Sequence, residues 1–79
     1  MNIGDCLYLT AEFFEFDGNE DFANSFELGV KYRVMKRVIL SDGFIGITSL
    51  KNEDTDEIIR AAGDTLLLST SIPGEYNVI

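Results

Sequence analysis

The chain has 79 residues, of which 46 % are hydrophobic, so it can bury one small core and we expect a single domain over residues 1–79. Fourteen acidic and six basic residues give a net charge of −8, whereas nucleic acids and anionic membranes attract positively charged surfaces. The charge therefore argues against direct binding to DNA, RNA or a membrane.

The chain contains one cysteine, Cys6, and no histidine. One cysteine cannot form an intramolecular disulfide, which favours a reducing environment. The first residues lack the basic segment and apolar run of a signal peptide, and no apolar run is long enough to span a membrane. We therefore expect a cytoplasmic protein.

The first predicted element is a bent strand over residues 6–16. Alternation of apolar residues places one set on one face of this strand: Leu7, Leu9, Ala11 and Phe13. Phe14 and Phe16 fall on the opposite face, and one extra residue in a strand moves every later side chain to the other face. The change of phase predicts a β-bulge or bend near Phe13 and Phe14.

An acidic, turn-rich connection follows over residues 17–29. A connection that contains several large apolar residues is unlike a flexible linker. We expect three of its side chains to pin it to the rest of the domain: Phe22, Phe26 and Leu28.

A β-hairpin is predicted over residues 30–50, because two runs rich in β-branched and aromatic residues flank Asp42-Gly43. In the first run the even positions form an apolar face: Val30, Tyr32, Val34, Val38 and Leu40. Lys36 interrupts this face, so it lies either at a bulge or beyond the edge of the sheet. In the second run Ile45 and Ile47 face inward, and Gly46 permits a kink or a close backbone approach.

The polar segment after the hairpin leaves two alternatives open. Asp54 or Thr55 can cap a short helical turn near residues 55–62, and Gly63 can end it. A strand from Glu57 to Arg60 is the alternative.

The C-terminal part predicts two further strands separated by a turn at Pro73-Gly74. The first runs from Thr65 to Ile72. Its expected inward residues are Leu66, Leu68 and Ile72, with Leu67 facing outward. The second is a short closing strand over residues 75–79.

Five short strands with one long early connection favour a small barrel. The run Phe26-Glu27-Leu28-Gly29-Val30-Lys31-Tyr32-Arg33-Val34 resembles the F-x-x-G-x-x-Y-x-V pattern of small SH3-like β-barrel proteins of bacteria and phages. The resemblance implies a mainly β, five-stranded SH3-like barrel, to which we add the helical turn near 55–62. It does not imply the peptide binding of eukaryotic SH3 domains, because the chain has no Trp and lacks their aromatic groove.

The chain lacks the residues that most catalytic and metal-binding sites require. Without histidine there is no side chain with an unperturbed pKa near neutrality to activate a nucleophile, so Cys6 is interpreted as structural. Asn52, Asp54 and Asp56 have the spacing of an EF-hand loop, but Glu57 stands where that loop requires a glycine. We expect no enzyme activity, no cofactor and no metal site.

The acidic residues gather in two segments, one from residue 12 to 27 and one from 53 to 57. They act either as a solubilising coat or as a surface that binds a basic partner. The residues predicted to contact such a partner are Glu15, Asp17, Glu20, Asp21, Phe22, Glu27, Glu53, Asp54, Asp56 and Glu57.

The functional hypothesis is a protein-binding module, specifically an inhibitor encoded by a phage or mobile element. Its acidic surface would imitate nucleic acid and occupy a basic, nucleic-acid-handling site on a partner protein. The alternative is a structural or assembly subunit that self-associates through a sheet edge, so a monomer and a homodimer both remain open. The basic residues Lys31, Arg33 and Arg37 either pair with acids across the sheet or form a contact patch.

Overall fold

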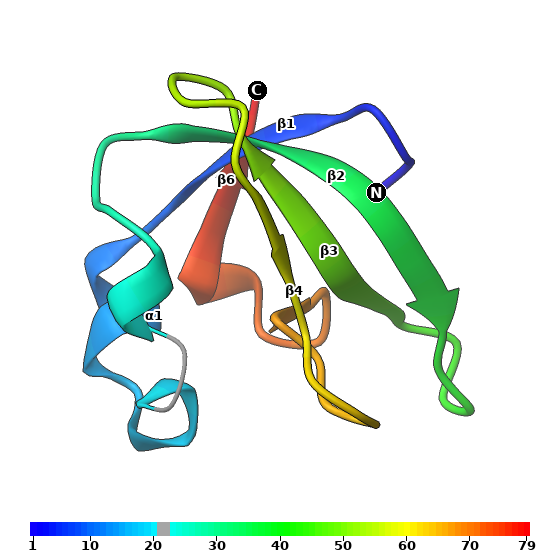
Figure 1. Cartoon of the computed structure of the whole chain (residues 1–79). Coiled ribbons are helices and arrows are strands. Elements are labelled where there is room, and N and C mark those ends of the chain that lie inside the picture. Colours follow the sequence, from blue (N-terminus) through cyan, green and yellow to red (C-terminus); the bar gives the residue numbers. More distant parts are fainter. Residues whose placement is uncertain (21–22) are drawn as a thin grey trace.

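Six strands form a single antiparallel sheet in the computed structural model, which describes residues 1–20 and 23–79 (Figure 1). The strands are β1 (Cys6–Leu9), β2 (Lys31–Ile39), β3 (Ile45–Asn52), β4 (Ile58–Arg60), β5 (Leu68–Ser69) and β6 (Tyr76–Val78). Short helical turns connect them: α1 (Ala11–Glu15), η1 (Asp17–Asn19), η2 (Ala23–Ser25) and η3 (Pro73–Glu75). The prediction of a mainly β fold is confirmed. None of the helices in the described ranges is both long and apolar enough to cross a membrane.

The sheet has two open ends. Its order is β4-β3-β2-β1-β6, and β5 pairs with β3 beside the place where β4 ends. Within the described part of the chain no pairing joins β4 to β6, so the sheet is not closed into a barrel. The predicted five-stranded barrel is therefore wrong in strand number and in closure.

The central hairpin is confirmed. Gly43 has a φ of +88°, a conformation that glycine adopts without strain, and the Leu40 amide donates to the Phe44 carbonyl at 2.8 Å. Lys36 lies at a β-bulge, because the pairing register of β2 and β3 shifts on both sides of it. Tyr32 and Val34 are fully buried as predicted.

The end of this hairpin extends beyond the core. Val38 was expected to face inward but is 43 % exposed. Figure 1 shows the tip of the β2–β3 hairpin projecting from the rest of the molecule, and Val38 lies in the last part of β2, which leads to this tip.

The predicted first strand is wrong beyond Leu9. The chain turns at Thr10 and forms α1, in which the Phe16 amide donates to the Glu12 carbonyl at 3.1 Å. Consecutive residues lie about 100° apart around a helix but on opposite faces of a strand, so the helical turn lets Phe13 and Phe14 both reach the core. Phe13 is fully buried and Phe14 packs edge-on against it, with ring centroids 5.2 Å apart.

The predicted helical turn near 55–62 is also wrong, and the alternative strand is present as β4. Asn52 Oδ1 accepts hydrogen bonds from the Asp54 and Thr55 amides, which forms a turn in place of a helix cap. Asp56 has a φ of +62° and redirects the chain, so the Asn52 amide can donate to the Glu57 carbonyl at 2.8 Å. The segment then pairs with β3.

Only Leu68–Ser69 forms a strand within the segment predicted as strand from Thr65 to Ile72. Leu67 was expected outside but is 2 % exposed, whereas Ile72 was expected inside and is 39 % exposed. Alternation between the two faces holds only along regular strand, and most of this segment is turn or loop.

Three other predictions about packing are confirmed. The predicted closing strand is present as β6, and it pairs with β1. Gly46 is a point of close approach, because a Cβ there would lie 2.7 Å from Leu66 Cδ2. Phe26 anchors the long connection, with its ring edge-on to the rings of Phe13 and Tyr32. Leu28, by contrast, is 63 % exposed, and Phe22 lies outside the described residues.

The core is formed between the sheet and the segment that contains α1 and Phe26. It consists of Leu7, Leu9, Phe13, Phe26, Tyr32, Val34, Ile47, Leu50, Ile59, Leu67 and Leu68. It draws residues from five of the six strands, and α1 and the connection to β2 supply the two phenylalanines.

Candidate protein-binding surface

The candidate surface is centred on Tyr32, at the start of β2. Its side chain is fully buried, and its hydroxyl oxygen accepts a hydrogen bond from the Glu27 amide at 2.9 Å. Its ring packs edge-on against Phe26, with centroids 5.1 Å apart. These two contacts fix the end of the connection that carries Glu27 against the sheet.

Three exposed carboxylates belong to segments that adjoin Tyr32, and we call them the acidic face: Glu27, Asp54 and Glu57. The Glu27 amide bonds to the Tyr32 hydroxyl, and Asp54 and Glu57 lie in the turn that follows Asn52, the residue paired with Tyr32. Burial is the main cause that raises the pKa of Tyr32 above its ordinary value, and the negative charges of these three residues raise it further. All three are exposed, and none forms an ion pair with a described residue. The fold thus brings together acids from both predicted acidic segments.

The β3–β4 turn holds its part of the acidic face in place. Asn52 Oδ1 accepts from the Asp54 amide at 2.8 Å and from the Thr55 amide at 3.2 Å. The Thr55 hydroxyl accepts from the Glu57 amide at 3.3 Å. The turn is therefore fixed by its own side chains, and its carboxylates project from a defined backbone.

Glu53, which the sequence also assigned to partner binding, is engaged within the molecule. Its Oε1 accepts from Arg33 Nε at 2.7 Å, and its Oε2 lies 3.5 Å from Lys51 Nζ. The hydrogen bond from Arg33 is the main cause that lowers the pKa of Glu53, and it also raises the pKa of Arg33. Lys51 Nζ lies 3.7 Å from Asp56 Oδ1 as well, so these two acids are partly neutralised by the sheet's own cations.

The remaining predicted contact residues do not join the acidic face. Glu15 lies on α1, Asp17 on η1 and Glu20 directly after it, and all three are exposed. Figure 1 shows this segment at the opposite end of the molecule from the β3–β4 turn. Asp21 and Phe22 lie outside the described residues.

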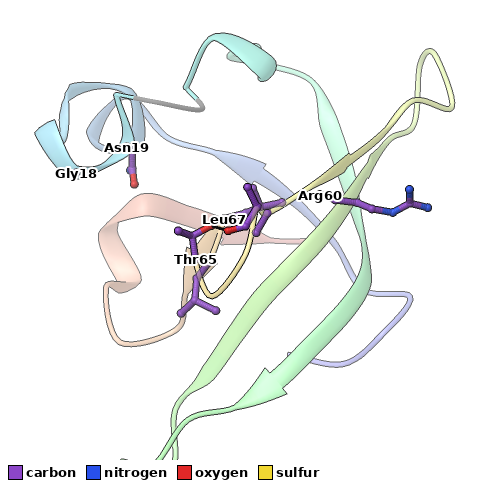
Figure 2. Close-up of a pocket in the computed structure, with 8 residues that line it drawn as sticks. Gly18, Asn19, Arg60, Thr65 and Leu67 are labelled. Carbon is purple, nitrogen blue, oxygen red and sulfur yellow. Dashed lines mark hydrogen bonds between the residues drawn. The ribbon is translucent and has the colours of Figure 1, made fainter.

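A cavity that the sequence did not predict lies between η1 and the connection from β4 to β5. Its volume is about 620 Å³, and its lining residues are Gly18, Asn19, Arg60, Ala61, Ala62, Thr65, Leu66 and Leu67. Figure 2 shows the Arg60 guanidinium pointing away from Thr65 and Leu67, so the wall here is mainly apolar. The small residues Ala61-Ala62-Gly63 were the available sequence signal, but their proximity to η1 depends on the fold.

Other reactive groups are sparse. The described residues contain no group of three or more acidic, cysteine or histidine side chains able to hold a metal ion. Cys6 is half-buried, with its sulfur 3.8 Å from Glu53 Oε1. The exposed carboxylates of the acidic face can attract and orient a positively charged molecule.

Comparisons of the chain with protein-family models, with curated proteins and with solved structures each gave no match. Function is accordingly inferred from the geometry and charge of the chain itself.

Proposed function

We propose that the protein is a non-enzymatic protein-binding module whose acidic face docks on a basic, nucleic-acid-handling site of a partner protein. One observation carries this proposal: the fold brings two distant segments to Tyr32, and their exposed carboxylates form no ion pair with a described residue. Glu53 and Asp56 are partly balanced by cations, whereas Glu27, Asp54 and Glu57 leave their charge available to a partner.

Electrostatic complementarity explains how such a face would work. Negative potential on the binder speeds encounter with a positive groove, and fixed carboxylates can replace phosphates there. The role we propose is therefore inhibition by competition with nucleic acid, as expected of an inhibitor encoded by a phage or mobile element.

We also infer a relationship to the small SH3-like proteins that the run from Phe26 to Val34 resembles. In support, Phe26, Tyr32 and Val34 of this run are all buried, and the long connection lies between the first two strands. The return of β6 to pair with β1 is consistent with it. In this chain the sheet is open between β4 and β6.

The acidic face is tested by two variants of equal net charge. The first changes Glu27, Asp54 and Glu57 to lysine, and the control changes Glu15, Asp17 and Glu20 to lysine. Each reversal alters the charge by two units, so both variants move from −8 to −2. Their comparison separates the position of the charge from its total.

The measurement is competition with DNA for DNA-binding proteins captured from a lysate, at low and high salt. We expect the wild type and the control to displace DNA at low salt, and the acidic-face variant to lose displacement. High salt should weaken the interaction, because it screens exposed charges. Equal loss in both variants, or binding that salt does not affect, would refute the proposal.

The second candidate is an assembly subunit that self-associates through a sheet edge. The observation that favours it is that both terminal strands carry exposed apolar residues, namely Ile58 on β4 and Val78 on β6. Native mass spectrometry distinguishes the two functions. A stable symmetric oligomer at low micromolar concentration supports assembly, and a monomer supports the binding module.

A further inference from the structure

The outer edge of β4 offers unpaired backbone groups. The Asn52 amide donates to the Glu57 carbonyl, and the Ala61 amide donates to the Thr48 carbonyl. In an antiparallel pair the residues that bond across the ladder alternate with residues whose amide and carbonyl point the other way. The register therefore directs the backbone groups of Ile58 and Arg60 away from β3, where no other strand of the described chain lies.

The cavity lies at the end of this edge, because Arg60, the last residue of β4, and the following Ala61 and Ala62 line it. Ile59 is buried on the core side of β4, and Ala61, two residues later, packs against the core and lines the cavity. A strand added along β4 would direct its inward side chains beside Ile59 and Ala61. Figure 2 shows Asn19 across the cavity from Leu67, with the Arg60 guanidinium directed outward. An apolar side chain of the added strand could enter this space.

Four carboxylates and one cation, the exposed Arg60 on β4, lie around the site. Asp17 and Glu20 flank the lining residues Gly18 and Asn19, and Asp64 precedes Thr65. At the other end of β4, Glu57 directly precedes Ile58 and belongs to the acidic face. These four carboxylates are exposed, so a segment lying along β4 would be favoured if it carried Lys or Arg.

We propose that β4 captures an extended, basic segment of the partner protein as an additional antiparallel strand, with one apolar side chain of that segment in the cavity. Strand addition of this kind takes affinity from main-chain hydrogen bonds and specificity from pockets for alternate side chains. This inference rests on the proposed function and names the part of the partner that is recognised.

A second copy of the chain fits this edge less well. Each copy has a net charge of −8, so two copies repel each other as they approach. Like charges at an interface oppose association. A basic segment of a partner carries positive charge and is therefore attracted to this acidic chain.

The probe is an acetylated and amidated heptapeptide with the sequence lysine-threonine-threonine-leucine-threonine-threonine-lysine, which places no lysine directly opposite Arg60. In an antiparallel strand whose central leucine faces inward, the amides of the third and fifth residues point toward β4 and those of the second and sixth point away. N-methylation of the third and fifth residues removes the bonding amides. N-methylation of the second and sixth residues is the matched control.

We expect methylation of the third and fifth residues to weaken binding at least roughly tenfold in isothermal titration calorimetry, and methylation of the second and sixth to leave it nearly unchanged. Replacing the central leucine with alanine should also weaken it roughly tenfold. Equal affinity of the two methylated peptides would overturn strand addition. A leucine-to-alanine change without effect would overturn occupation of the cavity.

Two protein variants give an independent test. Arg60→Pro removes an outward amide and leaves the ladder with β3 intact, while Arg60→Ala retains this amide and removes the same charge. We expect Arg60→Pro alone to lose peptide binding. Should Arg60→Pro fail to fold, slower hydrogen exchange of the Ile58 and Arg60 amides in the wild-type complex tests the same contact. Unchanged exchange at both amides would contradict it.

The acidic-face variant with Glu27, Asp54 and Glu57 changed to lysine separates this inference from the proposed function. If it still binds the peptide with the same sensitivity to methylation, the edge site stands and the electrostatic proposal fails. If it loses the peptide while methylation has no effect on the wild type, the acidic face stands and strand addition fails. A free chain that is already dimeric with protected β4 amides would assign the edge to a second copy.

Discussion

Arg33 on β2 and Glu53 directly after β3 form an ion pair in which Arg33 Nε donates to Glu53 Oε1 at 2.7 Å. Arg33 and Lys51 are opposite each other across the two strands, and like charges in that position repel. Glu53 lies between them, with Lys51 Nζ 3.5 Å from its Oε2. The carboxylate thus allows two cations to occupy neighbouring positions on one face of the sheet.

The change Glu53→Gln is expected to lower the melting temperature at pH 7, and more so at low salt, because Arg33 and Lys51 then face each other without a balancing charge. The folded pKa of Glu53 is lowered below the ordinary value of 4.5, so its contribution is present above that value and is lost as the pH falls through the folded pKa. The difference between variant and wild type should therefore shrink as the pH falls below 4.5. Thermal unfolding from pH 3 to 7 measures it.

Glu15→Gln is the control for this change, because Glu15 is exposed on α1 and takes part in none of the three ion pairs among the described residues. A Glu53→Gln effect no larger than that of Glu15→Gln would contradict the stabilising role of Glu53.

The change Tyr32→Phe is expected to reduce stability at pH 7 by about 0.5–1.5 kcal/mol, because it removes the hydrogen bond from the Glu27 amide. The pKa of Tyr32 is raised above the ordinary 10.0, so the folded state keeps a proton that the unfolded state releases. Its contribution is complete below pH 10 and is lost as the pH rises through the folded pKa. Urea unfolding should show stability falling more steeply above pH 10 in the wild type than in Tyr32→Phe.

Absorbance at 295 nm gives a direct check of the same group. The chain has three tyrosines, and Tyr8 is 39 % exposed. We expect a titration step above the ordinary tyrosine value of 10.0, and we expect Tyr32→Phe to remove this step while Tyr8→Phe retains it. A single shared titration would be inconsistent with the buried hydroxyl.

The change Asn19→Ala is expected to cost about 1–3 kcal/mol of folding free energy. Asn19 Nδ2 lies 2.8 Å from Glu75 Oε2 and 2.8 Å from the Phe13 carbonyl, and Glu75 is only 3 % exposed. Removing this donor deprives a buried carboxylate of a hydrogen bond. Asn24→Ala, at an exposed position on η2, is the control and should change stability by less than about 0.5 kcal/mol. Denaturant unfolding compares the two.

Hydrogen exchange in the free protein should alternate along β4. The Ile59 and Ala61 amides point toward β3 and are expected to be protected, whereas the Ile58 and Arg60 amides point outward and should exchange rapidly. Two-dimensional NMR in deuterated buffer resolves the four amides. Protection of all four in a monomer would mean that another segment of the chain covers the edge.

Local chemistry was enough to predict part of this fold. The turn at Asp42-Gly43 is encoded in two adjacent residues. A cation in an otherwise apolar face indicated a bulge or an edge position at Lys36, and the bulge is the one present. Phe26 was identified because a large apolar residue in an acidic connection needs a buried environment. In each case the deciding interaction lies within a few residues along the chain or follows from burial alone.

The errors arose where two local structures had similar free energies. Residues 11–15 can form either an extended strand or a helical turn. The helical turn forms because it brings Phe13 and Phe14 to the core together. Residues 58–60 were predicted to lie in a helical turn or, alternatively, in a strand, and pairing with β3 stabilises the strand. Both decisions depend on partners far away in the sequence, which periodicity within a short window does not contain.

The candidate surface shows the same division. The sequence alone determined that the protein is acidic, that its acids form two segments and that histidine is absent. The tertiary structure decided that Glu27 joins Asp54 and Glu57 at Tyr32, that Glu53 is occupied by Arg33, and that the edge of β4 stays open beside a cavity. Composition sets the total charge, but which charges meet, cancel or remain free depends on distances that only the folded chain defines.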